Sequence, residues 1–137
     1  MATQVDLIFK KFLSNIEDES WLMIENSVIE DLMYEYLDNA TAEFDTCRKD
    51  LTIENDYIVS DLNNLEILIL AKGMILQYLE PKIICEKNLR QDVTSKDFSK
   101  LSNANMLDKM IKLKELTRKE FDTLQTKYDY KEFEGLN

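Results

Sequence analysis

The sequence predicts an all-α protein, a helical bundle built around a long, mostly buried central helix. The 137 residues include only two glycines and one proline, so the tight turns of a many-stranded β-protein would be scarce. Apolar residues recur at helical spacing along much of the chain. The stretch 65–79, LEILILAKGMILQYL, has only three polar residues, Glu66, Lys72 and Gln77. It is too short to span a membrane and is expected at the centre of the bundle.

The central helix is predicted over about 64–85. Asn63 and Glu66 have the N-x-x-E spacing of a capping pair at its start. Pro81 is expected to kink or stop it. Gly73 costs about 1 kcal/mol relative to alanine in mid-helix, and close approach by another helix would offset that cost. Since one chain of this size has room to bury such a helix only partly, neighbouring subunits are expected to bury the rest.

Two helices are predicted before the central one. Thr3 and Asp6 stand in capping-box-like spacing ahead of a short amphipathic helix, VDLIFKKFL. Ser27 and Glu30 form an S-x-x-E capping box before a helix over about 28–48. Trp21, the single tryptophan, has two readings, a core anchor or a contact to a partner subunit.

The remaining segments follow from turn and helix signals. Residues 49–62 form a connection with turn chemistry at Asn55-Asp56 and a brief extended piece at 57–59. A polar loop is predicted over 94–102, and a long C-terminal helix over about 103–128. The apolar stripe of that last helix is expected to face the core and comprises Leu107, Met110, Leu113, Thr117, Phe121, Leu124 and Tyr128. Residues 1–128 thus form a single helical domain, and 129–137 a polar tail that is either frayed or ordered by a partner.

The net charge of −10 is concentrated in the first half of the chain. Residues 1–66 have 16 acidic and 4 basic side chains, whereas residues 103–137 have seven of each. This balance disfavours free binding to nucleic acid, which depends on cations that contact phosphates. Asp31, Glu35 and Asp38 contribute to an acidic side of the second predicted helix.

The residue types predict a protein that is not an enzyme and needs no cofactor or metal. The chain has no histidine, which removes the commonest general base and zinc ligand. It has no phosphate-binding GK[ST] loop and no D-x-D-x-D-G calcium loop. Cys47 and Cys85 are isolated in sequence. An enzymatic alternative would be a metal held by the carboxylates of Glu30, Glu35 and Asp38.

A series of segments from about Leu32 to Phe133 resembles a known family. A helix-forming segment ends in FDTCRKDL and is followed by DLNNLEILILAKGMILQYLEPKI. Then come NLRQDVTSKDFSKLSNANMLDKMIKLKEL and the tyrosine-bearing YDYKEF. Their order is similar to that of the head–tail connector (adaptor, or neck) proteins of tailed bacteriophages that infect Gram-positive hosts.

The resemblance implies a structural virion protein that forms a ring, commonly a dodecamer, between the portal protein and the stopper or tail-completion protein. The ring would extend the DNA channel without binding DNA specifically and would dock the next neck protein. The chain would be located in the virion neck, and in the host cytoplasm during assembly. No membrane is involved.

The resemblance also assigns roles to particular residues. Tyr128, Tyr130 and Phe133 become candidates for portal contact. Phe98, in the predicted 94–102 loop, becomes a candidate for contact with a neighbouring subunit or the next ring. If the acidic side chains Asp31, Glu35 and Asp38 line the channel, they would repel DNA phosphates and let DNA slide. The acidic side could equally face outward.

A different class of function competes with this one. The chain could be a small acidic regulator or inhibitor that binds another protein, for example by imitating the charge of DNA. Such a protein would be a monomer or dimer with the acidic helix side as its binding surface. The even charge balance of residues 103–137 weakens this alternative.

Overall fold

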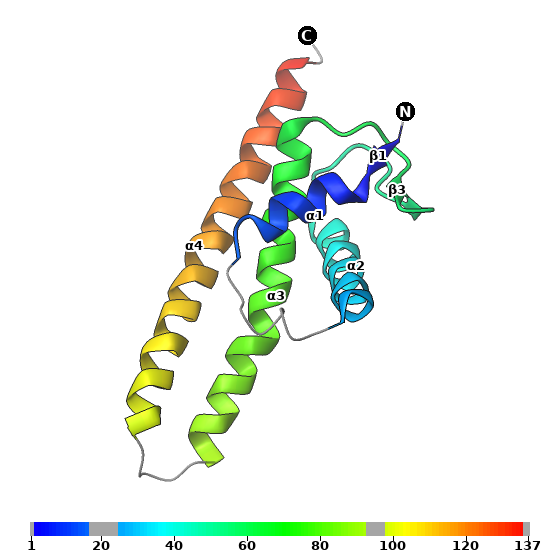
Figure 1. Cartoon of the computed structure of the whole chain (residues 1–137). Helices are drawn as coiled ribbons and strands as arrows, with labels where there is room; N and C mark the ends of the chain where they lie inside the picture. Colours follow the sequence, from blue (N-terminus) through cyan, green and yellow to red (C-terminus); the bar gives the residue numbers. More distant parts are fainter. Residues whose placement is uncertain (1, 17–24, 93–97, 136–137) are drawn as a thin grey trace.

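The protein is a bundle of helices around one central helix, with a small sheet at one end (Figure 1). The computed structural model describes residues 2–16, 25–92 and 98–135. The helices in these ranges are α1 (Val5–Leu13), α2 (Asn26–Glu43), α3 (Asn64–Asp92) and α4 (Phe98–Gly135). α3 contacts each of the other three helices, and α4 runs beside it along most of its length. The prediction of an all-α fold is confirmed.

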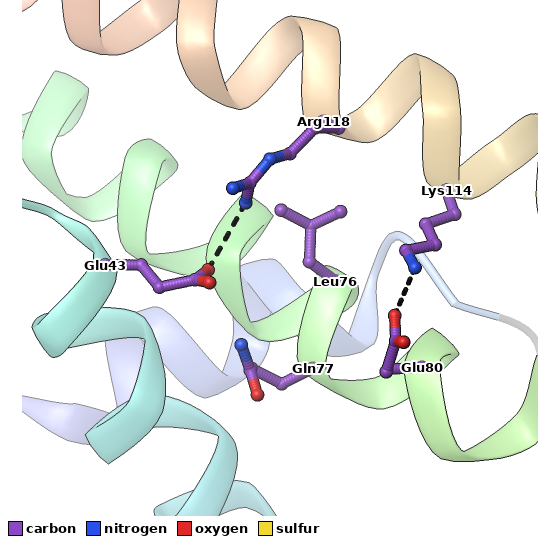
Figure 2. A pocket seen from close by; sticks show the side chains of 6 residues that line it. All are labelled: Glu43, Leu76, Gln77, Glu80, Lys114 and Arg118. Atoms are coloured by element: carbon purple, nitrogen blue, oxygen red, sulfur yellow. Dashed lines mark hydrogen bonds and ion pairs between the residues drawn. The ribbon is translucent and has the colours of Figure 1, made fainter. Parts of the chain in front are cut away.

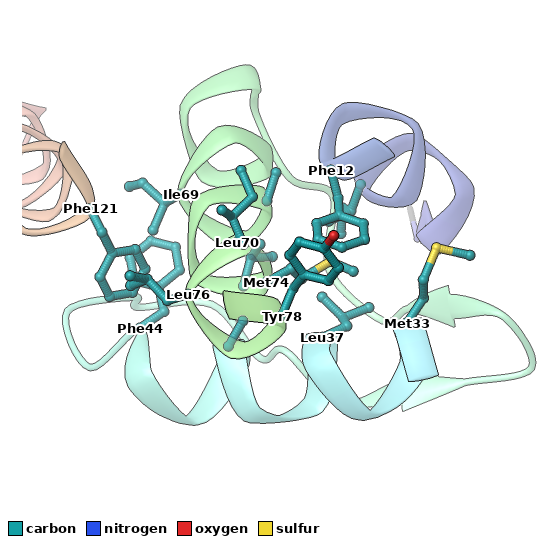
Figure 3. Close-up of a cluster of buried hydrophobic side chains, with 14 of the residues drawn as sticks. Phe12, Met33, Leu37, Phe44, Ile69, Leu70, Met74, Leu76, Tyr78 and Phe121 are labelled. Atoms are coloured by element: carbon teal, nitrogen blue, oxygen red, sulfur yellow. The ribbon is translucent and has the colours of Figure 1, made fainter. Parts of the chain in front are cut away.

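The core surrounds the first half of α3. Figure 3 looks along this helix and shows Phe121 of α4 on one side, Phe12 of α1 on the other, and Leu37 of α2 below. Ile69, Leu70 and Met74 of α3 are fully buried between them. The prediction of a mostly buried central helix is confirmed. The chain's own helices cover it, so its burial does not require neighbouring subunits, contrary to the expectation above.

Gly73 is the point where three helices meet most closely. A Cβ atom added to Gly73 would lie 2.9 Å from the Cβ of Ala40 in α2 and 3.2 Å from Cε1 of Phe121 in α4. Real Cβ atoms do not approach other atoms this closely, so a side chain here would push the helices apart. The expected close approach is confirmed, and α2 and α4 both make it.

α3 begins at the predicted cap and ends later than predicted. The backbone N–H of Glu66 donates to the side chain of Asn63 at 2.9 Å, and the N–H of Asn63 donates to the Glu66 carboxylate at 2.8 Å. This reciprocal pair satisfies two free N–H groups at the helix start. Pro81 lies inside α3, which continues to Asp92 rather than ending near 85. Ile83, just beyond Pro81, is buried, and this packing favours continuation of the helix.

Two other predicted caps are absent. α2 begins at Asn26 after Glu25, with no side-chain cap hydrogen bond, so the Ser27–Glu30 box is not formed. α2 ends at Glu43, earlier than the predicted 48, because the backbone leaves helical geometry at the buried Phe44. α1 begins after Gln4, also without a side-chain cap.

Thr3 belongs instead to a three-stranded antiparallel sheet. The strands β1 (Thr3–Gln4), β2 (Ile53–Glu54) and β3 (Tyr57–Ile58) are ordered β1-β3-β2. Asn55 and Asp56 connect β2 to β3 with φ of 49° and 67°, as a tight hairpin turn requires. The Thr3 hydroxyl donates to the carbonyl of Ser60 at 2.8 Å and accepts from the N–H of Leu62 at 2.8 Å. The sheet therefore ties the start of the chain to the segment that leads into α3.

α4 is longer at both ends than the predicted 103–128. It begins at Phe98, so residues 98–102 of the predicted 94–102 loop are helical, and 93–97 lie outside the described residues. It continues to Gly135, so the predicted tail is a continuation of the helix as far as that residue. Residues 129–135 are charged or polar in sequence apart from Tyr130, Phe133 and Gly135, and their backbone is helical. Trp21 lies outside the described residues.

Candidate interaction surfaces

The acidic face of α2, formed by Asp31, Glu35 and Asp38, is exposed to solvent. These side chains follow i, i+4, i+7 spacing and so form one row along the helix. They lie across α2 from Met33 and Leu37, which pack in the core. The helix has five acidic and no basic residues, and no described ion pair involves the three side chains of this face. Its negative charge therefore faces outward without local neutralisation.

The basic face of α4 combines exposed lysines with exposed leucines. It consists of Lys109, Lys112, Leu113, Leu116 and Lys119, all of which are exposed. Leu113 is 42% and Leu116 55% accessible. The prediction that Leu113 faces the core is wrong, because the buried face of α4 is centred on Thr117, Phe121 and Tyr128.

The lysines of this face have no partner among the described ion pairs. Leu116 borders an open groove of about 480 Å³ between α3 and α4, which Leu68 and Leu124 also line. Lys72 of α3 crosses the edge of this groove to pair with Glu120 at 2.9 Å. The surface thus combines exposed leucines with lysines that have no partner in the described ion pairs, and the Lys72–Glu120 pair lies at the groove. Apolar groups with polar neighbours are the pattern of an interface core with a polar rim.

The opposite flank of α4 is joined to the rest of the bundle by ion pairs (Figure 2). Arg118 reaches Glu43 of α2 at 3.5 Å, and Lys114 pairs with Glu80 of α3. Residues two apart on a helix point in nearly opposite directions, so Leu116 lies across α4 from Arg118. The basic face of α4 therefore points away from α2.

A buried polar network holds the C-terminal half of α4 against the start of α3. The side chain of Glu66 is fully buried, and its carboxylate accepts a hydrogen bond from the Tyr128 hydroxyl at 2.7 Å. It also forms an ion pair with Lys49 at 2.7 Å, and Lys49 donates to the carbonyl of Asp61 at 2.8 Å. With the N–H of Asn63, three donors satisfy this carboxylate, as a buried charge requires.

Tyr128 is consequently a core residue rather than a surface contact. Only 1% of it is accessible, and its ring packs edge-on against Phe44 at a centroid distance of 5.1 Å. Burial and the hydrogen bond to Glu66 raise the pKa of Tyr128 well above its ordinary value, so the hydroxyl remains a donor. Its assignment to portal contact is corrected on this ground. The Cys47 thiol lies 4.0 Å from the hydroxyl.

The other predicted contact residues are all on α4. Tyr130 is 65% accessible, only two residues from the buried Tyr128. Phe98 is the first residue of α4 and Phe133 lies near its end, but their side chains lie outside the described part of the structure. The structure therefore places Phe98 and Phe133 at opposite ends of one long helix (Figure 1).

Sequence reasoning missed the basic face of α4 and the buried Glu66 network. A signal for the first was present, since Leu116 lies off the main apolar stripe and has Lys112 and Lys119 one turn away on either side. The contacts of Glu66 with Lys49 and Tyr128 join residues that are distant in sequence, and no local pattern indicates them.

Within the described ranges, no group of three or more His, Cys, Asp and Glu side chains is arranged to hold a metal ion. In the same ranges, no helix has both the length and the apolarity of a membrane span. Comparisons with protein-family models, curated proteins and solved structures found no match to this chain.

Proposed function

We propose that this chain is the repeating subunit of a ring in the neck of a tailed bacteriophage, between the portal and the stopper or tail protein. The proposal starts from the resemblance of residues 32–133 to head–tail connector proteins. The observation that carries it is the presence of oppositely charged faces on two helices of one bundle, the acidic face of α2 and the basic face of α4. A subunit with complementary surfaces on different sides can associate head-to-tail, which is how cyclic rings form.

In such a ring the acidic face of α2 has two candidate positions. Facing the central channel, it would repel DNA phosphates and keep passing DNA from binding. Facing a neighbouring subunit, it would be neutralised by that subunit. Replacement of Asp31, Glu35 and Asp38 by lysine distinguishes between these two positions of the acidic face. A channel lining predicts an intact ring with slower DNA passage, and a subunit contact predicts loss of the ring.

The rival function is a small acidic regulator that imitates DNA. The observation in its favour is the same exposed row of carboxylates on α2, which takes part in no ion pair within the described part of the chain. A regulator of this kind would remain a monomer or dimer and would bind a basic protein surface through α2. Its α4 would then have no need of exposed leucines among unpaired lysines.

The experiment that tests the connector function is the addition of the purified protein to portal-bearing, tail-free capsids. Electron microscopy of these capsids should show new ring-shaped density at the portal vertex and nowhere else on the shell. Capsids lacking the portal are the matched control and should remain undecorated. Undecorated portal vertices at saturating protein would contradict the connector function and favour the regulator.

A further inference from the structure

The basic face of α4 and the acidic face of α2 match each other in charge and in length. Lys112, Leu116 and Lys119 follow i, i+4, i+7 spacing, as do Asp31, Glu35 and Asp38. At about 1.5 Å per residue, each row extends about 10 Å along its helix. A lysine row can therefore lie along a carboxylate row with a cation opposite an anion at both ends.

Apolar groups accompany both rows. Leu113 and Leu116 are exposed beside the lysines, and Val28, one turn before Asp31 on α2, is 46% accessible. Ala42, one turn after Asp38, is also exposed. Bringing the two faces together would remove these apolar groups from water and would leave the charges at the rim, where they set orientation and partner choice.

A single chain cannot join these faces to each other. The flank of α4 that faces α2 is the one with Arg118, which already pairs with Glu43. The basic face points the other way, and the acidic face of α2 points away from the core that lies between α2 and α4. Any pairing of the two faces must therefore be between molecules.

We propose that the basic face of α4 in one copy binds the acidic face of α2 in the next copy. The contact is heterologous, because each copy uses a different surface toward each of its two neighbours, and repetition gives a ring when the rotation closes. This inference rests on the proposed ring-forming function and identifies the surfaces that would join its subunits. It assigns α2 to the subunit contact rather than to the channel.

The test is a charge swap measured by sedimentation velocity at about 20 mM salt, where surface charges are weakly screened. The wild-type chain should form assemblies larger than dimers in a concentration-dependent manner. The variant K112E/K119E and the variant E35K/D38K should each associate at least about 100-fold more weakly, because like charges would face each other across the contact. Higher salt should weaken the wild-type assemblies as well.

A one-to-one mixture of the two variants tests directly whether complementary charges restore assembly. The reversed face of each variant is complementary to the reversed face of the other, and their native faces are complementary too. The mixture should therefore recover assemblies that neither variant forms alone. Far-UV circular dichroism of each variant checks that the helices remain folded. The matched controls, K10E/K11E on α1 and D45K/E54K outside both faces, alter net charge equally and should assemble as the wild type does.

Wild-type assembly that both reversals leave intact, or a mixture that stays monomeric, would overturn the interface. A wild-type chain that remains monomeric at low salt would overturn it as well. Decoration of portal vertices is scored separately with the same proteins. If both variants decorate portal vertices, this interface is excluded and the connector function is retained. If assembly depends on the charge swap but no variant or wild-type protein decorates capsids, the interface is retained and the connector function is contradicted.

Discussion

The hydroxyl of Tyr128 provides the clearest single-residue test of the core. Replacement by phenylalanine removes one of three donors to the buried Glu66 carboxylate and leaves the ring packing in place. We expect Tyr128→Phe to lower the free energy of unfolding by about 1–3 kcal/mol, since a buried charge loses a hydrogen bond. Urea denaturation measures this. Tyr130→Phe, at an exposed site on the same helix, is the control and should have no effect; equal stability of the two variants would contradict the network.

Gly73 tests how closely the helices pack. Alanine would gain about 1 kcal/mol in helix propensity. Its methyl group would nevertheless collide with Ala40. Overpacking of this kind commonly costs about 1–3 kcal/mol, so after the gain in propensity we expect Gly73→Ala to be destabilising in net, by up to about 2 kcal/mol. Thermal unfolding of Gly73→Ala, Ala40→Gly and the double variant forms a cycle in which the second change relieves the first. A more stable Gly73→Ala protein would refute the close approach.

The two cysteines should differ in reactivity. Burial raises the pKa of the Cys47 thiol, whereas Cys85 is exposed. A raised pKa leaves less thiolate at a given pH, and the thiolate is the reacting form. At pH 8 we expect iodoacetamide to alkylate Cys47 at least about tenfold more slowly than Cys85, and the Cys47 rate to keep rising above pH 9. Mass spectrometry of timed samples gives both rates, with the urea-unfolded chain as the control in which the difference disappears.

At this scale, sequence reasoning succeeded where the interaction is local. The Asn63–Glu66 cap joins residues three apart in sequence. Gly73 could be linked to a close helix contact because glycine destabilises the middle of a helix, and close packing compensates for that loss of stability. The apolar stripe predicted that Tyr128 faces the core, but it does not reveal that Glu66, 62 residues away, accepts a hydrogen bond from its hydroxyl. The Ser27–Glu30 motif has the right spacing, but the helix begins at Asn26 after Glu25, so Ser27 lies two residues beyond the N-cap position and inside the helix.

At the scale of elements, the C-terminal end of α4 is the part with a separable role. Tyr128 anchors α4 in the core, whereas Tyr130 is exposed just beyond it. Residue 129 contributes only an exposed ion pair with Arg48 at 3.9 Å, which adds little stability. Deletion of 129–137 should therefore leave the bundle folded and abolish attachment to portal-bearing capsids, if this end contacts the portal as proposed.

Two measurements separate these effects. Circular dichroism melting should show the truncated and complete chains unfolding within a few degrees of each other. Capsid binding should fall for the truncated chain and, to a smaller extent, for Tyr130→Ala. Unchanged capsid attachment after the deletion would remove this end of α4 from the portal contact.

The helices themselves could be predicted from periodicity, but their ends and free faces could not. α4 extends past both predicted ends, and residues 98–102 and 129–134 contain no glycine or proline that would oppose a helix. Leu113 falls within the predicted stripe yet is exposed, since α3 covers only the side of α4 centred on Phe121. Which side of a stripe is covered depends on neighbouring helices, and this information is tertiary.

At the scale of the whole molecule, one chain forms a complete core and leaves charge as its main feature for assembly. The acidic half predicted from composition lies partly on an exposed face of α2. The compensating basic face on α4 depends on which side of that helix remains uncovered. A chain that buries its own core should fold without a neighbour, and its proposed association should respond to salt far more than its folding does.

The proposed ring at the portal vertex, joined through α4 and α2, can be seen by electron cryomicroscopy of decorated capsids at a resolution that separates helices. We expect a closed ring in which α4 of each copy lies along α2 of the next, with Lys112 and Lys119 opposite Asp31, Glu35 and Asp38. A portal vertex without a ring, or a ring in which α2 faces the channel and contacts no neighbour, would contradict it.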